Sequence, residues 1–100
     1  MPSEHRHSDR YPIEVWGKYR LANGVRREVV LKDLSDSGCR FYDKFSGLRG
    51  GERISIRIET LGPYDASVVW SEGGYVGVEF AQRLYGPMFD HIRLKLSGGH

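Results

Sequence analysis

Short hydrophobic runs, most of them alternating with polar residues, follow one another along most of the chain. In residues 12–21 every second position is hydrophobic except at Gly17, which we expect to mark a bulge. Further runs span residues 26–33, 39–42, 53–59, 64–70 and 75–80. A period of two places successive side chains on opposite faces of a β-strand. The pattern therefore predicts six short strands, each with one face buried.

Turn-forming residues separate these runs. Asn23-Gly24, between the first two runs, is the strongest short signal for a β-hairpin. Further turns are expected at residues 35–38, 46–51, 61–63 and 72–74, where Gly, Ser and Pro gather. Connections this short join antiparallel neighbours, so the predicted sheet is antiparallel.

The hydrophobic period changes near the C-terminus. Leu84, Met88, Ile92 and Leu96 recur every four residues, which is typical of one face of an α-helix. Pro87 suits the first turn of a helix and is excluded from its interior, so the helix is expected from about Pro87 to Leu96. Its apolar stripe needs a partner, and the open mouth of a barrel would supply one.

The expected fold is all-β: an antiparallel β-barrel of six to seven strands with a C-terminal α-helix. Residues 12–96 would form the barrel and helix. Residues 1–11 are polar and would form a flexible N-terminal arm, and residues 97–100 a flexible tail.

Composition narrows the class of protein. The chain has 100 residues, enough for one domain, and a net charge of only +2, which argues against binding to duplex nucleic acid. Cys39 is the only cysteine, so an internal disulfide and a cysteine zinc site are excluded, and we expect it to be a small buried strand residue. No run of about 20 apolar residues is present, so we expect no membrane insertion and a cytoplasmic protein.

No catalytic constellation stands out, and we expect no enzyme, no cofactor and no metal. His5 and His7 lie close together, but no further ligands are nearby, and solvated terminal residues explain them better than a metal site. None of the serines lies in a nucleophile-elbow pattern.

Two local motifs carry more information. Arg6 and Arg10 form an R-x-x-x-R pair just before the first strand, and Asp33-Leu34-Ser35-Asp36-Ser37-Gly38 forms a D-x-S-x-x-G turn after the second. Each motif alone is weak, because arginine pairs arise by chance and Asp, Ser and Gly are ordinary turn residues. Their order on this kind of fold is the stronger signal.

Together the two motifs resemble the signature of the PilZ domain family. Val68-Val69-Trp70, Gly77-Val78-Glu79-Phe80 and the C-terminal helix are also similar to that family. The resemblance implies a receptor for the bacterial second messenger cyclic di-GMP, with ligand contacts at Arg6, Arg10, Asp33, Ser35 and Gly38. Motility, exopolysaccharide synthesis or adhesion would then be under its control, through a downstream partner protein.

The chemistry of these residues suits that ligand. An Arg fork meets the O6 and N7 acceptors of guanine, and it also pairs with phosphate oxygens. The Asp33 carboxylate can accept from guanine N1–H and N2–H₂, the Ser35 hydroxyl can donate, and Gly38 allows close backbone approach. We expect nucleotide binding to order the arm. In the PilZ family the residues just ahead of the first arginine influence whether one nucleotide or a stacked pair is held, so the resemblance, with His5 at that position, implies one bound nucleotide.

Two alternatives stay open. A PilZ-like domain that binds no nucleotide and acts as a protein-interaction module is the nearer one. A barrel that binds single-stranded nucleic acid is the other, although Tyr11, Trp16 and Tyr19 do not form a convincing exposed row. Trp16 and Trp70 are expected to serve packing in the core or at a sheet edge.

Overall fold

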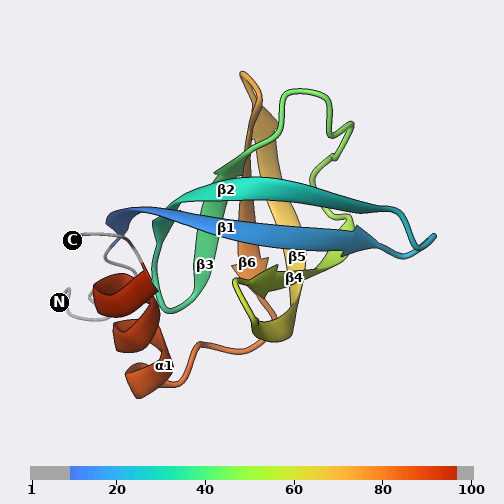
Figure 1. Ribbon diagram of the computed structural model, residues 1–100. Coiled ribbons are helices and arrows are strands. Elements are labelled where there is room, and N and C mark those ends of the chain that lie inside the picture. The colour runs from blue at the N-terminus through green and yellow to red at the C-terminus, as the bar shows by residue number, and fades with distance from the viewer. Residues whose placement is uncertain (1–9, 97–100) are drawn as a thin grey trace, which may run out of the picture.

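Six strands close into an antiparallel barrel in the computed structural model, which describes residues 10–96 (Figure 1). The strand order around the barrel is β1-β2-β3-β6-β5-β4. The strands are β1 (Tyr11–Leu21), β2 (Arg26–Leu34), β3 (Gly38–Tyr42), β4 (Arg53–Ile58), β5 (Leu61–Glu72) and β6 (Tyr75–Phe80). The predicted fold class is confirmed, with six strands, and β1 begins at Tyr11, which the sequence had grouped with the arm.

Alternate positions of the strands fill the barrel. Tyr19 on β1 and Phe41 on β3 are fully buried, and their rings stack at 5.2 Å between centroids. Each large apolar side chain buried here contributes about 1.5–3 kcal/mol relative to exposure. Cys39 is fully buried in β3, and burial raises the pKa of its thiol to about 12, so it is an inert core residue.

Gly17 is not a bulge. It lies in regular pairing, opposite Val29 on β2 and Ile58 on β4, and the register of β1 shifts only between Pro12 and Val15. A Cβ at Gly17 would collide with the Leu31 side chain, so the glycine is the inward position that makes room for Leu31. The predicted bulge was therefore wrong. A glycine that interrupts an alternating strand can mark a bulge, but it can also leave space for a neighbouring core side chain, as it does here.

The expected turn at residues 61–63 lies inside β5. Leu61 already pairs with Ile58, and the chain reverses at Glu59 and Thr60 instead. Glu59 takes a positive φ of 55°, so a non-glycine residue supplies the left-handed conformation that the tight reversal requires. Gly62 and Pro63, the usual turn residues, are accommodated in the strand through a cis peptide bond.

The C-terminal helix packs against one end of the barrel. It begins as α1 (Gly86–His91), with Pro87 in its first turn, and continues as the π-helix η2 (Ile92–Leu96). Leu84 and Ile92 are buried in the barrel core, and Met88 packs against it, as the stripe predicted. Figure 1 places the helix beside the start of β1, where the rings of Tyr11 and Phe89 lie 5.7 Å apart.

The change to a π-helix at Ile92 was not predicted, because a hydrophobic repeat of four residues is compatible with both an α-helix and a π-helix.

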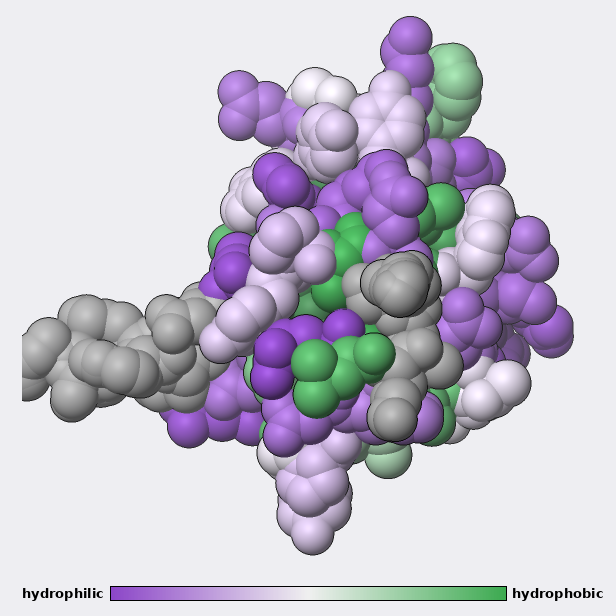
Figure 2. Space-filling model, turned by 60° about the vertical axis from the view of Figure 1, so that its left-hand side comes forward, coloured by the Kyte–Doolittle hydropathy of each residue, from purple (hydrophilic) through white to green (hydrophobic). Residues whose placement is uncertain are grey.

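Figure 2 views the side of the molecule where the helix lies, and hydrophilic residues predominate there, with small hydrophobic areas between them. Within residues 10–96, no helix combines the length and the apolar character that crossing a bilayer demands.

A polar network is buried beside the core at the end of β3. The Asp43 carboxylate accepts hydrogen bonds from Tyr19 Oη at 2.9 Å and from Arg27 Nη2 at 2.8 Å, and also from Arg27 Nε. The hydrogen bonds from Arg27 are the main reason that the pKa of Asp43 lies below its usual value. Burial is the main reason that the pKa of Tyr19 is raised, and hydrogen bonding to Asp43 adds to it.

We expect Asp43→Asn to destabilise the fold by about 2 kcal/mol at pH 7, because the buried carboxylate of a partly buried ion pair loses its charge. The lowered pKa means that the carboxylate stabilises the fold above about pH 4, and that this contribution is lost as the pH falls through the folded-state value. Urea unfolding at several pH values should therefore give a smaller acid-induced loss of stability in the variant.

Glu14→Gln is the matched control, because Glu14 pairs with Lys32 at 2.8 Å on the exposed surface. It should leave the unfolding midpoint almost unchanged. Equal stability of Asp43→Asn and wild type at pH 7 would contradict this account of the network.

Candidate functional site

The D-x-S-x-x-G motif forms the tight connection between β2 and β3. Leu34 pairs with Cys39 and Asp33 with Arg40, and the Ser35 amide donates to the Gly38 carbonyl at 2.9 Å. Asp33 therefore ends β2 at one side of the turn, and Gly38 begins β3 at the other.

Ser35 holds the turn together from inside. It is 1% exposed, and its Oγ accepts hydrogen bonds from the amides of Ser37 and Gly38, both at 3.2 Å. A small hydroxyl suits this position because it satisfies two backbone donors that no strand reaches. Its hydroxyl proton is directed to acceptors within the turn, the Gly38 carbonyl at 3.4 Å or Ser37 Oγ at 3.2 Å, so the expected donation to a ligand would require this proton to leave them.

Gly38 is required by close approach, and it does not take a positive φ. It faces Glu79 in the β3–β6 pairing, and a Cβ at this position would collide with the Val78 carbonyl oxygen of β6. The expected close backbone approach is thus made to the neighbouring strand. This contact brings the turn against β6.

Asp33 lies between two arginines. Arg10 Nη1 donates to Asp33 Oδ1 at 2.8 Å, and Arg40 Nε lies 3.0 Å from Oδ2. The second contact is an ion pair without the alignment of a hydrogen bond, since Arg40 Nε has no hydrogen-bond partner among the described residues. The Asp33 side chain is 12% exposed, whereas those of Arg10 and Arg40 are 47% and 40% exposed. A largely buried carboxylate is thus flanked by two half-exposed cations.

Arg40 was not among the predicted site residues. Its guanidinium also lies 5.1 Å from the centre of the Tyr75 ring, a cation–π arrangement that holds it in place. The signal was present in the sequence, because Asp33 and Arg40 stand at matching distances on either side of the turn. Directly opposite residues of a hairpin are neighbours on one face.

A shallow depression of about 210 Å³ adjoins these residues. It is lined by Arg10, Ser37, Gly38, Val69, Trp70, Gly77, Val78 and Glu79. Trp70 lies on β5 opposite Gly77, and its ring occupies the space where a side chain at Gly77 would stand. Trp70 is 40% exposed on a closed barrel, so it lies neither in the core nor at a sheet edge, and it presents part of its ring to the depression.

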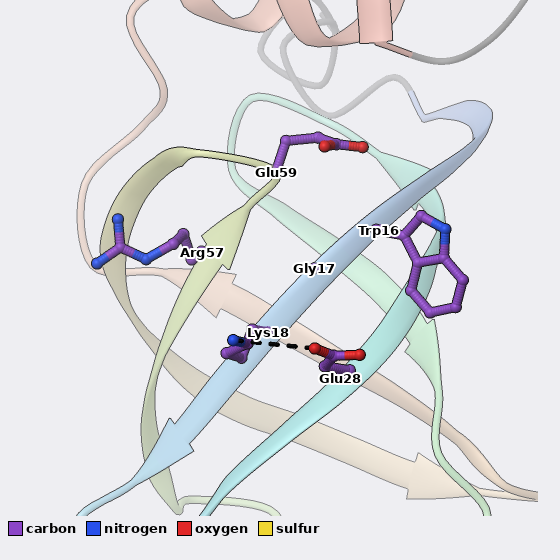
Figure 3. Close-up of a pocket in the computed structure, with 6 residues that line it drawn as sticks. All are labelled: Trp16, Gly17, Lys18, Glu28, Arg57 and Glu59. Atoms are coloured by element: carbon purple, nitrogen blue, oxygen red, sulfur yellow. Dashed lines mark ion pairs between the residues drawn. The ribbon is translucent and has the colours of Figure 1, made fainter.

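Trp16 does not pack in the core or at an edge, because it is 61% exposed. It lines a different depression, of about 320 Å³, with Gly17, Lys18, Glu28, Arg57 and Glu59. Figure 3 shows these residues on the outer surface of β1, β2 and at the end of β4. This larger depression contains none of the motif residues, so the motifs and not the volume identify the candidate site.

Four of the five predicted site residues come together in the structure. Arg10 contacts Asp33, and Ser35 and Gly38 build the turn that follows Asp33. Arg6 lies outside the described residues, as do His5 and His7. Arg40 and Trp70 were not predicted as site residues, and the structure places them beside the motif residues. Within residues 10–96, no three His, Cys, Asp or Glu side chains gather as they would around a metal ion.

The arrangement can bind a ligand that is both anionic and rich in hydrogen-bond donors. The two guanidinium groups can pair with phosphate or a planar acceptor edge, and Asp33 can accept from N–H groups. The exposed ring of Trp70 offers a flat apolar surface for a planar group.

Comparison with protein families gives one match: the family model of the PilZ domain covers residues 4–95. Comparison with curated proteins gives no match.

We expect Gly38→Ala to destabilise the fold by about 1–3 kcal/mol, because the added Cβ meets backbone of β6 that cannot move independently. Thermal unfolding followed by circular dichroism measures the effect. Gly86→Ala is the matched control, since open space surrounds Gly86 and its φ is not positive. A Gly38→Ala protein as stable as this control would show that the close contact with β6 is not a constraint.

Proposed function

Because the chain belongs to the PilZ domain family, a family of cyclic di-GMP receptors, we propose that it is a cyclic di-GMP receptor that signals to a partner protein. PilZ domains are binding and adaptor domains, and we propose no enzymatic activity for this one. The observation that carries the proposal is the contact of Arg10 with Asp33, which joins the two family motifs at one place on the barrel surface.

Each group of the site has a proposed role toward the nucleotide. Asp33 accepts hydrogen bonds from the N1–H and N2–H₂ groups of a guanine, and Arg10 and Arg6 pair with a guanine edge or a phosphate. Trp70 supplies a ring against which a base can stack, an interaction worth about 1–3 kcal/mol. Arg40 stays with Asp33 and keeps its carboxylate oriented.

Without ligand, the Arg10–Asp33 ion pair occupies both binding groups. Nucleotide binding then exchanges this pair for two new sets of charge-assisted hydrogen bonds. Since Arg10 is 47% exposed and Asp33 remains paired with Arg40, Arg10 can leave at low cost. Binding would thereby fix the segment that precedes Arg10 against the barrel, and the changed surface would be the signal that a partner reads.

The alternative of a domain without nucleotide binding finds no support in the motif residues, because Arg10, Asp33, Ser35 and Gly38 are all present and placed together. The alternative of a single-stranded nucleic-acid barrel is weakened by Tyr19. That residue is fully buried, so the aromatic row that such binding needs is interrupted.

Isothermal titration of the protein with cyclic di-GMP should give saturable binding with one nucleotide per chain. Arg10→Ala should weaken the affinity about tenfold, and the double variant Arg6→Ala, Arg10→Ala about a hundredfold or more, since each Arg loses charge-assisted hydrogen bonds. Arg49→Ala with Arg53→Ala is the matched control, because this pair has the same spacing elsewhere in the chain. Absence of binding by folded wild-type protein would overturn the receptor proposal.

Amide hydrogen exchange tests the proposed action on the arm. With saturating cyclic di-GMP, amides of residues 4–10 should exchange several-fold more slowly than without it, because their arginines contact the nucleotide. Amides of residues 22–25, in the β1–β2 turn, serve as the internal control and should not change. Equal exchange of the arm in both states would refute the ordering step while leaving binding itself intact.

A further inference from the structure

Positive charge is concentrated on the outer face of β1, β2 and β4, away from the proposed nucleotide site. An open groove of about 240 Å³ is lined by Lys18, Arg20, Arg26, Ser55, Arg57 and Pro63. Among the described residues, no carboxylate belongs to this lining. The whole chain carries a net charge of only +2, so the concentration is local.

The strand register sets like charges directly opposite one another. Lys18 faces Arg57 on β4, and Arg20 faces Arg26 on β2. Side chains opposite one another in an antiparallel pair have Cβ atoms about 5 Å apart, and like charges there are destabilising.

The positive charges of this groove have few acidic partners in the described part of the fold. Lys18 has one ion pair, with Glu28 at 3.9 Å, and Arg57 Nη1 donates to the Gly62 carbonyl at 3.3 Å. In the part of the chain that the structure describes, no carboxylate lies within 4.0 Å of Arg20 or Arg26. The arrangement costs stability, so a binding partner explains it better than folding does.

An exposed aromatic side chain lies in the depression next to this groove. Trp16, two residues before Lys18 on β1, lines that depression with Glu28 and Glu59, and the depression shares Lys18 and Arg57 with the groove (Figure 3). Exposed Trp beside Arg is the combination that most often dominates the energy of protein interfaces.

We propose that this face, formed by Trp16, Lys18, Arg20, Arg26 and Arg57, is a docking surface for an acidic segment of a partner protein. Asp or Glu side chains of the partner occupy the groove, and an apolar side chain packs on Trp16. Complementary charge guides the encounter and selects the partner, and the tryptophan supplies buried apolar area.

The carboxylates beside Trp16 argue against a continuous polyanion. A nucleic-acid strand that stacked a base on Trp16 would bring its phosphates near Glu28 and Glu59. An anionic membrane surface would meet the same two carboxylates. A peptide avoids this repulsion, because its acidic residues can be confined to the cationic end.

The docking surface does not rest on nucleotide binding. Arg10 and Lys18 are eight residues apart along the chain, a span of roughly 25 Å in an extended strand. The two sites can therefore be tested separately on the same protein.

The test uses the Trp70→Phe variant, in which Trp16 is the only tryptophan, and a short synthetic peptide in which Glu and Thr alternate before a terminal Leu. Saturable change of Trp16 fluorescence that weakens with added salt is the expected result. Oligothymidylate and phosphatidylglycerol vesicles are the competing probes. Tighter binding of either, or no saturable response to the peptide, would overturn the proposal.

Charge reversal identifies the residues responsible. Arg20→Glu with Arg57→Glu should weaken peptide binding tenfold or more, while the melting temperature stays level or rises by about 2–4 °C as repulsion is relieved. Arg49→Glu with Arg83→Glu makes the same charge change at exposed positions outside the face and should preserve binding. Unchanged affinity in the first pair would overturn the assignment. A parallel cyclic di-GMP titration of both pairs, made with Trp70 intact, reports the nucleotide site independently.

Discussion

The tight connection between β2 and β3 is the constraint on which the rest of the molecule depends. Ser35 accepts the amides of Ser37 and Gly38 inside the turn, and Gly38 lets β3 meet β6 without an intervening side chain. The β3–β6 pairing closes the barrel. The same turn sets Asp33 opposite Arg40 and within reach of Arg10, so one connection serves both the closed barrel and the site.

Much of the fold was predictable because a half-buried sheet requires strict alternation. The burial of Ile54, Ile56 and Ile58 follows directly from their spacing, and β6 was predicted with its observed bounds. The errors arose where one residue type serves two physical roles. Gly17 leaves room for the Leu31 side chain in the core and does not form a bulge. Gly62 uses its positive φ of 101° within β5, while Glu59, with a φ of 55°, makes the turn before it.

The part of the site that lies within the two sequence motifs was predictable. The four described motif residues lie close together because β1 pairs with β2. Arg10 comes just before β1, and the start of β1 lies beside the end of β2, where the turn with Asp33, Ser35 and Gly38 begins. Trp70 required the barrel register, since β5 reaches the turn only through its pairing with β6, whereas Arg40 could have been found from its position opposite Asp33 in the hairpin. The exposure of Trp16 could have been read from the alternation, because Trp16 shares its face of β1 with Glu14, Lys18 and Arg20, but the usual preference of tryptophan for packed positions was given more weight.

Titration of ¹⁵N-labelled protein with cyclic di-GMP, followed by amide and indole NMR signals, tests the central claim most directly. The account predicts that the largest changes fall on Gly38, Arg40 and the Trp70 indole, with little change at the Trp16 indole. Gly38 and Trp70 line the depression beside Arg10, and Arg40 pairs with Asp33, whereas Trp16 lies on the separate basic face. Changes centred on Trp16 and Arg57, or none at saturating nucleotide, would contradict the assignment of this turn as the nucleotide site.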